Sequence, residues 1–236
     1  IMKLKKIASL MLAGVMAVSM LTACGDNTVN DPEQPNKPVE PTPAGYSSVL
    51  GDALVAQNVV NRKVHMQDSN DLNAALKTAM EFAGEDIVSG IYDGAFANMP
   101  VYFNPSDGDA IQLVARKLVD VMDSVNDAGD FDSQQAIENL YADEDNYDED
   151  LNVTMLYVVN DGVSVNAALE YIAAEISEAV EDLDIDYDNV DGIWYDQKAE
   201  VEYDYTGSVS ADSVKLDANH GKGLTFIAIQ ITRTVV

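Results

Sequence analysis

The aspartates between positions 182 and 191 are the first candidates for a chemical role, because their spacing suits a metal ion. Asp182, Asp184, Asp186 and Asp188 recur at every second residue, and Asp191 follows shortly after. In a strand, alternate side chains share one face, and neighbouring carboxylates stand about 6.6 Å apart along the chain. One Ca²⁺ between two of them would complete its about six to eight oxygen ligands with backbone carbonyls and water. The spacing therefore suggests a loose calcium site, with a solvated acidic edge as the favoured alternative.

Neither acidic segment matches a specific calcium loop. That loop needs glycine in its sixth position and glutamate in its twelfth, whereas placing Gly192 sixth puts Lys198 twelfth. The denser run 143–150, DEDNYDED, lacks the same two residues. It could wrap a cation as a loop, but charge runs of this kind are usually flexible and solvated, and we expect that here. Ca²⁺ is the only cofactor that the sequence suggests.

Aromatic residues gather in the same part of the chain. The cluster consists of Tyr187, Trp194, Tyr195, Tyr203 and Tyr205. Amphipathic rings are enriched in surfaces that bind proteins or glycans. Their partial alternation also fits strand residues that pack a sheet. The cluster therefore indicates either a ligand-binding surface or a sheet core.

No arrangement of residues predicts a catalytic group. The two histidines, His65 and His220, lie far apart, and a zinc site needs several ligands at set spacings. Ser164 lacks the second glycine of a nucleophile elbow and is better explained as a helix cap. Paired carboxylates for glycoside hydrolysis exist in any chain this acidic, but nothing singles out a pair. An enzyme is therefore the less favoured class.

The charge balance narrows the class of partner. The chain carries 13 basic and 41 acidic residues, a formal net charge of −28, and residues 119–197 contain no Lys, Arg or His. Such a surface repels nucleic acid and other polyanions, which excludes nucleic-acid binding. It suits a cation or a basic partner. The alternative is a solvated surface that keeps the protein soluble.

The pattern of residues 46–236 predicts an α+β domain with an antiparallel or mixed sheet and several packed helices. Capped apolar periodicity indicates a helix after Ser69, and another after Ser164 whose buried stripe reaches Leu183. A third helix, capped by Ser106 or Asp107, should bury a stripe from Ile111 to Val125. Strands are expected at 99–103, 151–159, 199–208 and 224–231, the last buried on both faces. Segments with less regular patterns are 47–60 (helix or strand), 85–98 (short helix and loop) and 133–141 (loose helix).

A weak internal similarity suggests two related halves. Residues 73–76 and 166–169 both read Asn-Ala-Ala-Leu, and 90–93 (GIYD) resembles 192–196 (GIWYD). The separations between the paired motifs differ. Short alanine and leucine strings also recur by chance in helices, so coincidence is the favoured explanation.

The first residues have the pattern of an export signal. Lysines at positions 3, 5 and 6 precede the apolar or small-residue run 7–20, and Leu21-Thr22-Ala23-Cys24 closes the segment. This ending resembles the lipobox of bacterial lipoprotein precursors. The resemblance implies removal of residues 1–23 and attachment of diacylglycerol to the Cys24 sulfur. The protein is then expected on the outer face of the bacterial cytoplasmic membrane. An uncleaved anchor is disfavoured, because spanning a bilayer takes about 20 apolar residues.

Residues 24–45 are expected to be a tether between lipid and domain. Five of the seven prolines fall here, and no apolar period is present. At about 3.1 Å per residue in polyproline conformation, the segment reaches roughly 65 Å. The leading hypothesis is a surface-displayed lipoprotein whose domain binds a glycan or protein ligand, with cation assistance, through residues 182–205. The alternatives are an extracytoplasmic hydrolase acting on a glycan or wall polymer, and a purely structural acidic envelope protein.

Overall fold

The computed structural model describes residues 45–59, 63–84, 87, 98–188, 200–215 and 223–236. All of them lie in one unit, Glu40–Val236. Several predicted features fall outside the described residues. These are the signal and tether with Cys24, most of the helix expected at 85–98, Asp191, Trp194, Tyr195 and His220.

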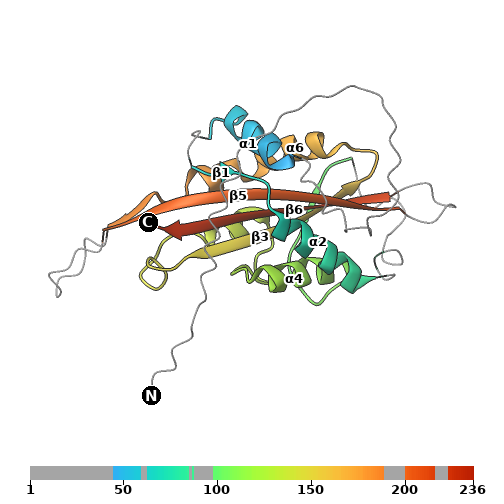
Figure 1. Cartoon of the computed structure of the whole chain (residues 1–236), viewed down its shortest axis with the longest axis horizontal. Coiled ribbons are helices and arrows are strands. Elements are labelled where there is room, and N and C mark those ends of the chain that lie inside the picture. Colours follow the sequence, from blue (N-terminus) through green and yellow to red (C-terminus); the bar gives the residue numbers. More distant parts are fainter. Residues whose placement is uncertain (1–44, 60–62, 85–86, 88–97, 189–199, 216–222) are drawn as a thin grey trace, which may run out of the picture. The chain divides into compact units, whose positions relative to one another are not determined.

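The predicted α+β class is confirmed, with a mixed six-stranded sheet among the described residues (Figure 1). The strands are β1 (His65–Met66), β2 (Val101–Phe103), β3 (Leu151–Asn160), β4 (Asp186–Asp188), β5 (Glu200–Lys215) and β6 (Gly223–Val235). Their order is β1-β5-β6-β3-β2, and β4 pairs with the start of β5. Every pairing is antiparallel except that of β1 with β5.

Strand β6 lies in the middle of the sheet and is apolar on both faces, as its sequence predicts. Ile227, Ile229 and Ile231 are buried on one face, and Phe226 and Ala228 are buried on the other. A strand that is buried on both faces needs apolar side chains at consecutive positions, because successive residues point to opposite sides. The same holds for β3, which is buried from Val153 to Val159 rather than on alternate positions only.

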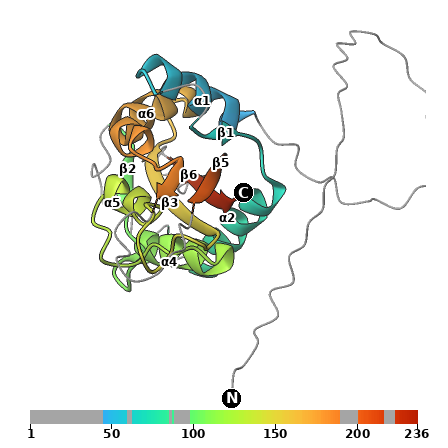
Figure 2. The ribbon, with the colours of Figure 1, turned by 90° about the vertical axis from the view of Figure 1, so that its left-hand side faces the viewer.

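Helices cover both faces of the sheet (Figure 2). On the face of Ile227 lie α1 (Tyr46–Ala56), α5 (Ser133–Glu138) and α6 (Val165–Glu181); on the face of Phe226 lie α2 (Asn70–Ala83) and α4 (Ala110–Met122). The ambiguous segment 47–60 is therefore helical over most of its length. Among the described residues, no helix has the length and apolar character needed to cross a bilayer.

Local capping chemistry sets where the long helices begin. The Ser69 side chain accepts a hydrogen bond from the Leu72 amide, and Ser164 accepts one from Ala167, as predicted. The predicted cap of α4 is wrong, because Asp109 occupies that position. Its carboxylate accepts from the amides of Ile111 and Gln112, and the Gln112 side chain accepts from the Asp109 amide in return. Asp107 instead forms an ion pair with Arg116.

The buried stripe expected to continue to Val125 ends earlier. Helix α4 stops at Met122, and Asp123 adopts the left-handed conformation with φ 52°. This turn directs the chain away from the helix axis. Val125, beyond the turn, is consequently 42% exposed, and Val121 in the last turn of α4 is also 42% exposed rather than buried.

The two Asn-Ala-Ala-Leu motifs lie in the first turns of α2 and α6. These helices pack on opposite faces of the sheet, with Leu76 in one core and Leu169 in the other. The second pair of motifs lies outside the described residues. The suggested duplication therefore stays a prediction.

Candidate functional site

The most unusual group in the structure is the guanidinium of Arg233, which is 0% exposed near the end of β6. Its Nη1 donates to the carbonyl oxygen of Leu140 at 2.9 Å. Its Nη2 donates to the carbonyl oxygen of Asn146, to Asn146 Oδ1 at 3.2 Å and to the carbonyl oxygen of Glu149 at 3.2 Å. The guanidinium also lies 4.7 Å from the centre of the Tyr203 ring. Residues 140–149 therefore surround a buried cation with neutral oxygens and one aromatic face.

The acidic loop, defined as residues 141–150, is held in place around Arg233 by further hydrogen bonds. The Asp143 carboxylate accepts from the amides of Asp145 and Asn146 at 2.9 and 3.0 Å. Tyr203 donates its hydroxyl proton to the carbonyl oxygen of Tyr147 at 2.7 Å. The expectation that this run is merely flexible is not what the structure shows: the loop wraps a cation, and the cation is a side chain of the protein itself.

The acidic residues of the loop are exposed, whereas the carbonyl oxygens of Asn146, Tyr147 and Glu149 accept hydrogen bonds from Arg233 and Tyr203. The exposed acids are Asp143, Glu144, Asp145, Asp148, Glu149 and Asp150. A fully buried charge loses hydration and needs compensating dipoles and nearby opposite charge. The carbonyl oxygens supply the dipoles. In the described part of the chain, the only ion pair that involves an arginine joins Arg116 to Asp107, so Arg233 has no carboxylate in direct contact.

Sequence reasoning missed Arg233, although a signal was present. Side chains alternate along a strand, so position 233 lies on the same face as Ile231 and Ile229. The pairing register places Arg233 between Leu151 of β3 and Tyr205 of β5. Extending the apolar alternation of β6 by one step would have predicted an arginine in the core.

The predicted calcium geometry at 182–188 is wrong, because the four aspartates do not share one strand face. Asp182 caps the C-terminus of α6. The Asp184 carboxylate accepts a hydrogen bond from the Ala142 amide at 3.0 Å. Only Asp186 and Asp188 belong to a strand, the short β4. Within the described ranges, no three His, Cys, Asp or Glu side chains converge on a possible metal position. Binding of Ca²⁺ itself stays a prediction.

The tyrosines of the predicted cluster divide between core and surface. Tyr203 and Tyr205 are only 6% and 2% exposed and belong to the apolar core that the sheet shares with α1, α5 and α6. The Tyr205 hydroxyl donates to the carbonyl oxygen of Asp184 at 2.8 Å. Burial raises the pKa of both phenols, an effect that the charge of Arg233 partly offsets. These two rings therefore belong to the sheet core, which is one of the two interpretations that the sequence allows for the cluster.

Tyr187 instead forms a surface with the acidic loop. Its ring stacks on that of Tyr147, with centres 5.1 Å apart and planes at 16°. The Tyr147 amide donates to the carbonyl oxygen of Asp143 at 3.1 Å, so the exposed Asp143 and Glu144 lie within one turn of the stacked pair. Partial desolvation raises the pKa of Tyr187, and the charges of Glu144 and Asp143 raise it further. We call Tyr147, Tyr187, Asp143 and Glu144 the acidic–aromatic surface. Ring faces beside carboxylates attract ammonium and guanidinium groups.

A hydrolase would require two carboxyl groups in one cleft. Among the described residues, Asp52 of α1 and Glu170 of α6 line the same cavity of about 400 Å³. No other feature of the described residues assigns a reaction to this pair. The hydrolase hypothesis therefore stays a prediction.

Comparison with known proteins finds no matching protein family, no matching curated protein and no matching solved structure.

Proposed function

We propose that this protein is an exported bacterial lipoprotein, anchored through lipid on Cys24, whose domain binds a lysine- or arginine-rich partner at the cell envelope. Residues 24–45 form the tether in this proposal, and the acidic–aromatic surface is the binding site. The role is binding rather than catalysis.

Support for the anchor comes from the first residues. A basic start, an apolar run and Leu21-Thr22-Ala23-Cys24 together form the pattern of a lipoprotein signal. Diacylglycerol supplies two acyl chains, and each buried CH₂ contributes about 0.8 kcal/mol to membrane affinity, which makes the attachment durable. A proline-rich segment of this length then separates the domain from the bilayer.

The observation that carries the binding proposal is the stacked Tyr147–Tyr187 pair, one turn from the exposed residues Asp143 and Glu144. A cation over such a ring gains about 0.5–1 kcal/mol at an exposed site, and more when it is desolvated. The net charge of −28 adds long-range attraction, which raises the association rate and weakens with salt. A partner with several cations would use both effects.

Substitution of the tyrosines tests the binding site. We expect Tyr187→Ala and Tyr147→Ala each to weaken binding of a decaarginine probe to the full chain about twofold to fivefold, because the ring faces are lost. Tyr171→Ala is the matched control, since Tyr171 is 43% exposed on α6, away from the acidic loop. Isothermal titration calorimetry at low and physiological salt would measure the affinities. Equal affinity of Tyr187→Ala and the unmodified protein would contradict the proposed site.

The anchor is tested separately. Metabolic labelling with a radioactive fatty acid should mark the unmodified protein and leave Cys24→Ser unlabelled. Mass spectrometry of the native product should find Cys24 as the modified first residue. An intact N-terminus or a free thiol would refute the lipid anchor without affecting the binding measurements.

A further inference from the structure

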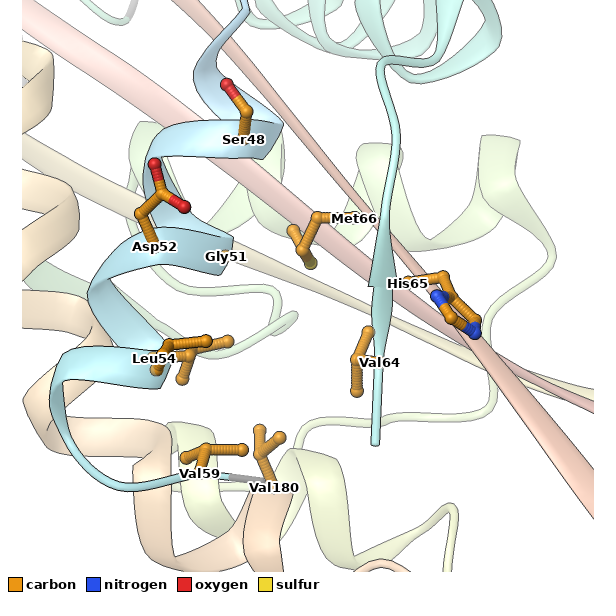
Figure 3. A pocket seen from close by; sticks show the side chains of 10 residues that line it. Ser48, Gly51, Asp52, Leu54, Val59, Val64, His65, Met66 and Val180 are labelled. Atoms are coloured by element: carbon orange, nitrogen blue, oxygen red, sulfur yellow. The ribbon is translucent and has the colours of Figure 1, made fainter. Parts of the chain in front are cut away.

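A second candidate ligand site is a cavity on the side of α1 that faces β1 and the end of α6. The cavity there has a volume of about 260 Å³. It is lined by Ser48, Gly51, Asp52, Leu54, Val55, Val59, Val64, His65, Met66 and Val180 (Figure 3). Neither the acidic loop nor the stacked tyrosines contribute to it.

The walls of this cavity are polar and apolar in nearly equal measure, and the apolar part is continuous between α1, β1 and α6. Leu54, Val59, Val64 and Val180 supply aliphatic surface, and Met66 points from β1 toward α1 (Figure 3). His65, the neighbour of Met66, points away from α1 and is exposed. This alternation follows from the short strand that positions both residues.

Two glycines fix the position of the methionine wall. A Cβ on Gly207 of β5 would lie 2.4 Å from Met66 Sδ, and a Cβ on Gly51 of α1 would lie 3.0 Å from Met66 Cγ. The missing side chains therefore let Met66 sit between helix and strand. β1 is tied to β5 at this point by the Gln67 amide, which donates to the carbonyl oxygen of Gly207 at 2.8 Å. The cavity is thus bordered by closely packed backbone on this side.

The rim of the cavity is acidic. Asp52 lines it on the exposed side of α1. Val59 is shared with a neighbouring cavity of about 280 Å³, whose lining includes Glu178 and Asp182. Both of these carboxylates lie in the last turn of α6 or just beyond it, where the helix dipole adds negative potential. The ammonium group of Lys63 already lies at this helix end, where its Nζ donates to the carbonyl oxygens of Glu181 and Leu183. Asp52 is therefore the carboxylate that serves the cavity itself.

We propose that this cavity binds an alkylammonium group, with the aliphatic chain between α1 and β1 and the positive head at the acidic rim. The volume lies below the about 300 Å³ at which pockets for drug-sized molecules begin, so the ligand is small. Apolar walls bury the chain. The charge of Asp52, which lines the cavity, selects an ammonium over a carboxylate of the same length.

The test uses octylammonium chloride as the probe, titrated into the full chain and followed by methyl NMR and calorimetry. We expect saturable shifts at Val59, Val64 and Val180. Octanoate should bind at least tenfold more weakly, because its head carries the opposite charge. Asp52→Asn should weaken octylammonium binding severalfold and leave the binding of neutral octanol unchanged.

A matched pair of variants checks the location. Val55 lines the cavity and is 43% exposed, so Val55→Phe should fill the mouth and weaken binding at least tenfold. Val121 on α4 is 42% exposed and lies away from the cavity, so Val121→Phe should bind as the unmodified protein does. Equal binding by Val55→Phe would overturn the proposal, as would equal affinity for octanoate. Dissociation of a dimer by Val55→Phe would also overturn it, because a second copy would then be the occupant.

Discussion

The acidic loop and the aspartate segment 182–188 have similar compositions but different roles in the structure. Both are rich in aspartate, and neither contains a basic residue. The acidic loop wraps the guanidinium of Arg233 with its carbonyl oxygens. The aspartate segment instead divides its side chains among a helix end, a backbone amide and a short edge strand. Density of acidic residues therefore does not reveal whether a segment surrounds a cation.

The difference arises from what each segment meets across the fold. Strand β6 brings Arg233 beneath the acidic loop, whereas the aspartate segment runs beside β5, which presents Tyr205 to the carbonyl oxygen of Asp184. A buried guanidinium can satisfy several carbonyl groups at once. A phenol donates to only one. The acidic loop consequently closes around its partner, and the aspartate segment stays extended.

The largest loss of stability should come from replacing the buried Arg233. Arg233→Met leaves the carbonyl oxygens of Leu140, Asn146 and Glu149 without their donor, and should lower the free energy of unfolding by about 3–5 kcal/mol. Urea denaturation measures this. Arg116→Met is the control, since Arg116 is 46% exposed and its ion pair with Asp107 lies at the surface, where such pairs contribute little. If the two variants lowered the free energy of unfolding by similar amounts, Arg233 would not be the residue that organises the acidic loop.

The second largest effect should be a loss of stability at high pH. Burial, with nearby carboxylates, raises the pKa of Tyr141 to about 12, and burial raises the pKa of Tyr102, Tyr157 and Tyr205 above the ordinary value of 10. From about pH 10 upward the unfolded chain loses phenolic protons that the folded chain keeps, so the free energy of unfolding falls as pH rises. Below about pH 10 this contribution is fully present. Urea denaturation across this range should show the decline, and a constant stability would contradict the burial of these phenols.

A smaller effect is expected on the aspartate segment. Tyr205→Phe removes the donor to the carbonyl oxygen of Asp184 and should cost about 1–3 kcal/mol, less than the loss of Arg233. The exposed Tyr171 provides the control, and Tyr171→Phe should leave stability unchanged. If Tyr205→Phe lowered the free energy of unfolding as much as Arg233→Met, the acidic loop would not depend on its partner more strongly than the aspartate segment does.

The smallest effect concerns divalent cations. The inward oxygens of the acidic loop are already bonded to Arg233, so we expect Ca²⁺ and Mg²⁺ at equal concentration to raise the melting temperature by similar small amounts through screening. Differential scanning calorimetry checks this. A rise specific to Ca²⁺ and abolished by Asp186→Asn would restore a calcium site on the aspartate segment.

Much of the fold could be predicted because it depends on local patterns. Ser69 and Ser164 begin helices through hydrogen bonds to amides three residues later, and both residues of each pair are visible in a short window of sequence. The α4 cap was misplaced within the same window, because Asp107 and Asp109 are chemically equal caps. Two contacts distinguish them: the Asp109 amide donates a hydrogen bond to the Gln112 side chain, and Asp107 forms an ion pair with Arg116.

The candidate site was predicted only in part. Tyr187 belongs to the aromatic cluster that the sequence predicts, but its stacking partner Tyr147 lies 40 positions earlier in the chain and is not part of that cluster. Tyr203 and Tyr205 fit a binding surface and a sheet core equally well until the helix that covers them is known. Their burial in the core on the α1, α5 and α6 side of the sheet decides between the two.

The sequence by itself determined the elements: the α+β class, the capped helices and an inner strand that is apolar on both faces. These properties follow from periodicity and hydrogen bonds between near neighbours. Only the tertiary structure decided which cation the acidic loop surrounds. Arg233 lies more than 80 positions from its carbonyl partners, and their contact depends on the pairing of β6 with β3 and β5, which no short window of sequence contains.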